Sequence, residues 1–356
     1  MTEKWAIDTE LGEVLQKNEE RLIDQIAAAS SAGVRLQDQG GKPLALRDAH
    51  PKAHGCVLAE FRVEDQLPPH LAQGVFVPGK SYPAWIRFSN GFPDAKQPDA
   101  KPDVRGMAIK LLGVPGDKVL PEERDAQTQD FILISHPVFF ADDVADYLTF
   151  TRLMGSGQKL RAVFALGIRG AWNLIRSVSR PASPLEIRYW SMVPYRLGDP
   201  PHKQAIKFSV TPCRPATARP SHPQSDFLRE TMKKQLEAGE ARFDFLVQPR
   251  TSTMSVERSL VEWKENQAPF FKVATITIPR QLFSTPERDS FGEQLSFTPW
   301  HSLPQHRPLG AVNRIRRVVY DTIAKRRHEL NKTPRHEPDA NDAEAARAEL
   351  RKLMSS

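Results

Sequence analysis

The feature that most constrains the fold is a series of short strand-like runs separated by clusters of Pro, Gly and Asp. From about Leu44 to Leu112 these runs are CVLAEFRV, GVFVPG, YPAWIRFSN and GMAIKLLGV, and they are rich in β-branched and aromatic residues. An eight-stranded barrel needs four more strands. AIKFSVTPC, RFDFLVQPR and FFKVATITIP are clear candidates, LEIRYWSMVPYRLG can supply the missing one, and DFILIS is also strand-like. This spacing predicts an antiparallel barrel or meander.

Helical periodicity fills the gaps between these runs and divides the chain into three parts. Residues 10 to about 32 predict a lead-in helix, and further helices are expected from about Asp142, over KLRAVFALGIRGAWNLIRSV and over DFLRETMKKQLEAG. The expected organisation is a helical lead-in at 1–39, one domain at 40–332 and a polar tail at 333–356, with a short helix near its end.

Charge and cysteine content narrow the choice of partners and compartment. The net charge of +7 suits an anionic partner, but basic residues are spread among acids without an aromatic platform, which argues against nucleic acid. Cys56 and Cys213 form no CxxC or CxxCH motif. The N-terminus lacks an apolar signal segment and no apolar run reaches 18 residues. A cytoplasmic location is expected, and a homo-oligomer stays open.

The segment KLRAVFALGIRGAWNLIRSV, residues 159 to 178, sets Arg161, Arg169 and Arg176 among apolar residues. Such a helix can rest on a membrane surface. The sequence favours the simpler interpretation, a packed helix with solvated arginines.

Arg316 and Tyr320 lie four residues apart in NRIRRVVYDTIAKRRHEL, and Arg327 follows seven residues later. At about 100° per residue on a helix, the three side chains fall within about 40° of one another. A phenolate binds iron strongly, a guanidinium nearby favours that form, and tyrosine is a known axial ligand of heme iron. The alternative is a basic amphipathic helix whose tyrosine packs at its edge.

Two further polar groups precede or occupy predicted strands. Arg47, His50 and His54 lie just before the run CVLAEFRV. A heme site that cleaves peroxide needs a base near the iron, and histidine suits that role near neutral pH, although a histidine here is more simply a loop residue. In WIRFSN, Arg87 and Ser89 share one strand face, where serine can orient an imidazole and arginine can bind a carboxylate.

These residues belong to six motifs that occur in one order. They are RxxH at Arg47 and His50, HxK ending at Lys52, RFS at Arg87 to Ser89, DxRGxAxK at Asp103 to Lys110, PxFFxxD at Pro137 to Asp143, and RxxxY at Arg316 and Tyr320. Over about residues 40 to 330 the chain resembles the heme catalases. Because it is shorter than a typical catalase, it is most similar to the reduced, catalase-related heme proteins of bacteria.

The resemblance implies an α+β fold, an eight-stranded antiparallel β-barrel with peripheral helices, that binds heme b (iron protoporphyrin IX). Tyr320 would be the proximal iron ligand, with Arg316 hydrogen-bonded to it. His50 would be the distal base, assisted by Ser89. The residues that match the family's propionate-binding and distal-pocket positions are Arg47, Arg87, Arg327, Phe139, Phe140 and Tyr147, although for the aromatic residues core packing is the simpler explanation.

The chain departs from the family on the distal side. The family's distal asparagine is absent from the stretch Ile134, Ser135 and His136, and Ser135 is the candidate replacement donor. Between His50 and Phe61 the chain has one more residue than typical catalases, so His54 remains a competitor for the role of distal base. His50 is favoured because Arg47 then matches the family's arginine position.

The expected function is peroxide metabolism by a weak catalase or a peroxidase, with hydrogen peroxide or an organic hydroperoxide as substrate. Loss of the distal amide disfavours fast dismutation, because a second peroxide must be oriented as the reductant. The alternatives are a fatty acid hydroperoxide lyase or isomerase of the allene oxide synthase type, and a heme-binding protein without turnover.

Overall fold

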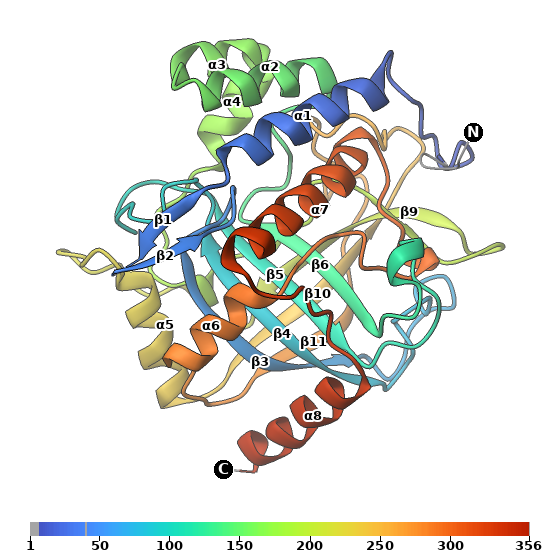
Figure 1. Cartoon of the computed structure of the whole chain (residues 1–356). Coiled ribbons are helices and arrows are strands. Elements are labelled where there is room, and N and C mark those ends of the chain that lie inside the picture. Colours follow the sequence, from blue (N-terminus) through green and yellow to red (C-terminus); the bar gives the residue numbers. More distant parts are fainter. Residues whose placement is uncertain (1–6, 40, 356) are drawn as a thin grey trace.

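The computed structural model describes residues 7–39 and 41–355, and its centre is a closed barrel of eight antiparallel strands (Figure 1). The strands are β1 Leu36–Gln39, β2 Lys42–Ala45, β3 Ala53–Val63, β4 Ser81–Asn90, β5 Arg105–Leu112, β6 Thr128–Ile134, β7 Tyr189–Trp190, β8 Tyr195–Leu197, β9 Gln204–Pro212, β10 Ala241–Pro249 and β11 Phe271–Ile278. The ring runs β10-β11-β3-β4-β5-β6-β7-β9, and β9 pairs back to β10. The predicted fold class is therefore confirmed.

Alternation along the strands separates a core from an outer face. In β4, Phe88 faces the interior, whereas Arg87 faces outward and pairs with Glu293. The interior is filled by aromatic rings, such as those of Phe131 and Phe245, whose centroids are 4.9 Å apart. Each such buried side chain contributes about 1.5 to 3 kcal/mol. The outer face carries polar residues such as Arg87 and Ser89, and apolar residues such as Trp85 where a helix covers it.

One predicted strand, GVFVPG, is wrong. Phe76 from this segment enters the barrel and is fully buried. The backbone of Val75 is engaged by side chains instead of a strand, because its N–H donates to His306 Nε2 at 3.0 Å and its carbonyl accepts from the Tyr82 hydroxyl at 3.1 Å. DFILIS provides β6. LEIRYWSMVPYRLG supplies β7, as expected, and also β8, which pairs with β9 outside the ring of eight strands.

Across the described residues, 7–39 and 41–355, eight α-helices surround the barrel. They are α1 Glu19–Gly33, α2 Val144–Gly155, α3 Lys159–Ala165, α4 Gly167–Ser177, α5 Phe227–Ala238, α6 Pro286–Gln294, α7 Ala311–Asn331 and α8 Ala340–Met354. The single packed helix expected over 159–178 is wrong on two counts. Gly167, with φ +66°, breaks it into α3 and α4, and five of its large apolar side chains are exposed.

The lead-in helix starts at Glu19, later than predicted, because Glu13 and its neighbours bind the segment at the start of α7. The buried carboxylate of Glu13 accepts hydrogen bonds from the backbone N–H of Gly310 and from Arg314 and Arg307, each at 2.8 Å. An unpaired buried guanidinium would be costly, so this contact holds the N-terminal segment to the start of α7.

Helices at both ends of the chain cover the barrel. α1 packs on α7 through residues such as Ile23 and Ile315, and Figure 1 shows α7 crossing in front of β5 and β6. In the tail, α8 buries Ala343, Ala346 and Leu350 against the outer wall of the barrel. None of the helices built from the described residues has the length and apolarity that crossing a membrane requires.

Candidate active site

The outer faces of β4, β5 and β6 form one wall of the site. Ser89, Gly106 and Ile134 are directly paired across the three strands, so their side-chain positions share one face. His50 lies against this face. A Cβ atom on Gly106 would sit 2.5 Å from His50 Nδ1 and 2.8 Å from Ser89 Oγ, so glycine alone leaves room for the imidazole here.

His50 is held in an uncommon backbone conformation. Its φ is +60°, a region that non-glycine residues visit mainly when surrounding contacts enforce it. Its N–H donates to Gly91 O at 3.2 Å, and its carbonyl accepts from Arg87 at 3.0 Å. Its ring Nδ1 lies 3.0 Å from Ser89 Oγ. Burial, followed by the charges of Arg87 and Arg316, lowers the pKa of His50 to about 3, so the ring is neutral near pH 7.

His54 is directed elsewhere. A β-bulge between Ala53 and Gly55 shifts the register of β3 against β4, and the extra residue is His54. Its ring is 1% exposed, with Nε2 2.8 Å from Asn90 Oδ1 and Nδ1 3.9 Å from Asp99. The structure therefore brings His50, and not His54, together with Ser89.

The stretch that lacks the amide presents an apolar residue to the site. Ile134 is the residue paired with Gly106. Ser135 follows the strand, and its Oγ accepts the backbone N–H of Arg105 at 2.9 Å. The hydroxyl can still donate, but it is held by the backbone N–H of Arg105 at the start of β5. His136 is half-buried, and burial lowers its pKa to about 4.

The opposite wall is formed by α7. Arg316 places Nη2 and Nε 3.2 and 3.4 Å from the phenol oxygen of Tyr320. Its Nη1 lies 3.1 Å from Asn313 Oδ1 and 3.5 Å from the Tyr195 hydroxyl. Burial acts to lower the pKa of Arg316, but the two phenols raise it above its ordinary value. A charged guanidinium thus faces the tyrosine oxygen, as a phenolate ligand requires.

The two walls are close enough to interact electrostatically. Arg316 contributes to lowering the pKa of His50. Burial raises the pKa of Tyr147, Tyr320 raises it further, and Arg316 acts to lower it. Tyr147 belongs to an aromatic cluster at one end of the site, in which Phe139 and Phe140 have centroids 4.2 Å apart and each lies 5.8 Å from Tyr147. Phe150 joins this cluster at 4.9 Å from Phe140, and the sequence analysis missed it.

Arg47, Arg87 and Arg327 converge on a residue that the sequence analysis also missed, Glu293. Its carboxylate accepts from Arg47 at 2.6 Å and from Arg87 at 2.9 Å, and its backbone carbonyl accepts from Arg327 at 2.5 Å. Burial acts to raise the pKa of Glu293, but the three arginines lower it to about 2. The predicted arginines therefore form one cluster that already binds a carboxylate.

The charge of this cluster fits the group that the sequence predicts. Three guanidiniums and one carboxylate leave two positive charges, equal to the two propionates of heme b. The Nε atoms of Arg87 and Arg327 are buried without a hydrogen-bond partner among the described residues, so donors remain for further carboxylates. Buried carboxylates need such cations. The residues present therefore fit a dicarboxylate macrocycle between His50 and Tyr320.

Other members of the quoted motifs lie outside the site. Arg105 binds Asn90 and backbone carbonyls. Lys110 is fully buried and binds Asp130, His301 and Glu337. Within the part of the chain that the structure describes, these last three residues form the one cluster with spacing suited to a metal ion. The ammonium of Lys110 bonds to all three, so they need no ion to balance their charge.

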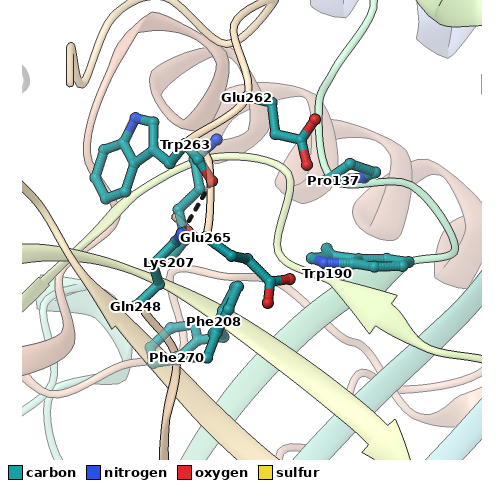
Figure 2. Close-up of a pocket in the computed structure, with 9 residues that line it drawn as sticks. All are labelled: Pro137, Trp190, Lys207, Phe208, Gln248, Glu262, Trp263, Glu265 and Phe270. Carbon is teal, nitrogen blue, oxygen red and sulfur yellow. Dashed lines mark hydrogen bonds between the residues drawn. The ribbon is translucent and has the colours of Figure 1, made fainter. Parts of the chain in front are cut away.

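Two hollows differ in their relation to the site. One, of about 230 Å³, reaches Tyr320 and is bordered by Arg317 and Arg335. The other, in Figure 2, lies beside the buried Lys207 and has a volume of about 10 Å³, room for one water molecule. None of the predicted site residues lines it. Burial lowers the pKa of Lys207 to about 7.

Comparison with known proteins identifies similar chains. No family model matches. One curated relative, the "Catalase-related peroxidase" of Mycolicibacterium paratuberculosis, is 29% identical over 270 residues, which cover 72% of this chain and 82% of the relative.

Similar solved structures include catalases from different kingdoms. Catalase A from Saccharomyces cerevisiae has a TM-score of 0.60 over 89% of this chain, a fungal catalase 0.59 over 81% and a bacterial catalase 0.57 over 94%, each at 16% identity. The match spans 67%, 60% and 66% of those catalases, respectively. Likeness at this identity shows the fold.

Proposed function

Because the chain belongs to the catalase-like superfamily, we propose that it is a heme b-dependent oxidoreductase that acts on peroxides as a peroxidase or a weak catalase. The observation that carries this proposal is the pairing of two built walls. His50 with Ser89 lies on one side, Tyr320 with Arg316 on the other, and a cluster of arginines with two surplus positive charges lies beside them.

Each residue then has a separate task. Tyr320 would ligate the iron, with its oxygen held by Arg316, while Arg47, Arg87 and Arg327 would bind the propionates. When bound, heme supplies the redox chemistry that cleaves the peroxide O–O bond. Phe139, Phe140 and Tyr147 border one end of the site between the two walls and exclude water.

His50 moves the proton. The tautomer in which Nδ1 donates to Ser89 leaves Nε2 as a base. Nε2 takes the proton from one oxygen of the peroxide and delivers it to the other oxygen, which departs when the O–O bond breaks. Because its pKa is about 3, the ring is in the accepting form at neutral pH.

Ile134 favours a peroxidase over a fast catalase. Dismutation requires a second peroxide to be oriented as the reductant, and a polar donor beside the base does this best. The residue paired with Gly106 has no such donor. An isoleucine also tolerates the alkyl group of an organic hydroperoxide.

The proposal is tested by purifying the protein with heme and recording its visible spectrum. Three activities are then measured: dye oxidation by peroxide, oxygen release from hydrogen peroxide, and product formation from a fatty acid hydroperoxide. We expect a five-coordinate ferric heme, oxidation of a dye by peroxide, and slow oxygen release from hydrogen peroxide. A spectrum that does not change when peroxide is added would indicate a heme-binding protein without turnover. Rearranged products from a fatty acid hydroperoxide, formed without a reductant, would indicate a lyase or isomerase.

A second expectation concerns Glu293. In Glu293→Gln the shape is kept, but three guanidiniums lose their anionic partner. We expect the heme-free protein to lose about 1 to 2 kcal/mol of unfolding free energy, below the cost for a fully buried pair because the Glu293 side chain is 23% exposed. Heme should restore much of this loss, since propionates supply the missing charge.

Thermal unfolding of the heme-free and heme-loaded proteins measures this difference. The matched control is Glu287→Gln, in the same helix but exposed, which should lower the melting temperatures of both forms slightly and equally. Equal destabilisation of the two forms by Glu293→Gln would contradict a shared role for Glu293 and the propionates.

A further inference from the structure

α3 and α4 present an apolar surface to the outside. Its members, which we call the α3–α4 face, are Leu160, Phe164, Ile168, Trp172 and Ile175. Phe164 is 81% exposed and Ile168 is 94% exposed. Single exposed apolar residues are ordinary, but five large ones on two consecutive helices mark an interaction site.

The opposite side of α4 is fixed to the body of the protein. Asn173 Nδ2 donates to Phe139 O at 3.3 Å and to Leu260 O at 3.0 Å. A Cβ atom on Gly170 would lie 2.5 Å from Phe140 O, so the helix and the Phe139–Phe140 segment are in close backbone contact. The apolar side chains therefore cannot turn inward without breaking this packing.

The charge around the face is mainly positive, with Asp142 as an acid near Arg169. From Tyr147 to Leu185 the chain has six basic residues and no Asp or Glu, although its net charge is only +7. The six are Arg152, Lys159, Arg161, Arg169, Arg176 and Arg180, all exposed. On α4, Arg169 and Arg176 fall about 80 to 100° from Ile168, at the edge of the apolar stripe.

We propose that the α3–α4 face docks on the surface of an anionic phospholipid bilayer. Apolar side chains flanked by cations match the acyl boundary and the anionic headgroups above it. A second copy of this chain fits poorly, because a two-fold contact would set the same cations against each other, and the six exposed basic residues outnumber the nearby acids. Docking would turn the Phe139–Phe140 edge of the candidate site toward the bilayer.

Flotation with vesicles tests this proposal in the full-length protein, independently of peroxide activity. We expect binding to vesicles of phosphatidylcholine mixed with phosphatidylglycerol, weak binding to phosphatidylcholine alone, and release by salt. Arg161→Gln/Arg169→Gln/Arg176→Gln should weaken binding by about 100-fold, at about fivefold for each cation. Phe164→Ser/Ile168→Ser/Trp172→Ser should abolish it.

The matched controls are Leu282→Ser and Arg351→Gln, which change an exposed leucine and an exposed arginine elsewhere and should bind like the parent. All variants are compared by circular dichroism, so that loss of fold is separated from loss of docking. No binding to anionic vesicles, or binding that both triple variants retain, overturns the proposal. Self-association without vesicle binding, lost in the apolar triple variant, also overturns it and assigns the face to a second copy.

Discussion

Replacing Tyr320 with phenylalanine should remove the proximal oxygen and lower both heme retention and peroxide turnover by at least about 100-fold. Outer-shell partners of a metal ligand already contribute about 10- to 100-fold, and the ligand itself should exceed them. Because only a hydroxyl is deleted from a half-buried ring, the fold should be kept. Heme content per chain, the visible spectrum and the rate of dye oxidation measure the loss.

Tyr195→Phe is the matched control for this variant. Tyr195 also contacts Arg316, at 3.5 Å, and is buried, but it is not the proposed ligand. We expect its heme content and spectrum to stay close to those of the parent. If Tyr320→Phe keeps the parent spectrum and heme content, the ligand assignment is wrong.

Replacing His50 with alanine should slow the reaction with peroxide by about 100- to 10,000-fold, the range that a positioned general base contributes. Heme content should change little, because His50 is not the proposed iron ligand. Stopped-flow measurement of the first reaction with peroxide isolates this step from later reduction.

His54→Ala is compared beside it. His54 lies in a buried network with Asn90 and Asp99, so its loss should lower the unfolding free energy by about 1 to 3 kcal/mol and leave the peroxide rate near that of the parent. Full reactivity in His50→Ala with a slow His54→Ala would transfer the role of the base to His54.

The low pKa of His50 adds a test by pH. An ordinary imidazole, with a pKa near 6.5, would be protonated as the pH falls from 7 to 5 and would stop accepting a proton. His50, with a pKa of about 3, stays neutral over that range. The rate of the first step should therefore be nearly constant from pH 7 to 5, and a tenfold fall there would contradict the assignment.

Much of the barrel could be predicted because strand formation leaves a local pattern. In β4, inward Phe88 and outward Arg87 and Ser89 alternate with the period of two that a pleated strand imposes. The wrong strand, GVFVPG, is also rich in β-branched and aromatic residues, but Phe76 fills the barrel interior. That use depends on packing between distant segments, which local periodicity does not report.

The distal side shows the same limit at the level of single residues. The sequence favours His50 over His54 only through the spacing from Arg47. A bulge in β3 separates the two histidines by turning His54 into the network of Asn90 and Asp99. Likewise, Ser135 was the expected donor, but strand register sets Ile134 across from Gly106. A shift of one residue exchanges the two faces of a strand.

By itself the sequence determined the residue types available for chemistry: the Arg316–Tyr320 pair at helical spacing, His50, Ser89, and the arginines that match propionate sites. Only the tertiary structure decided which of these meet. Glu293 reaches Arg47 across 246 positions of sequence and Arg87 across 206, and the α3–α4 face is exposed because α4 anchors by its other side. Both outcomes depend on long-range packing and pairing of charges, which a single linear pattern does not encode.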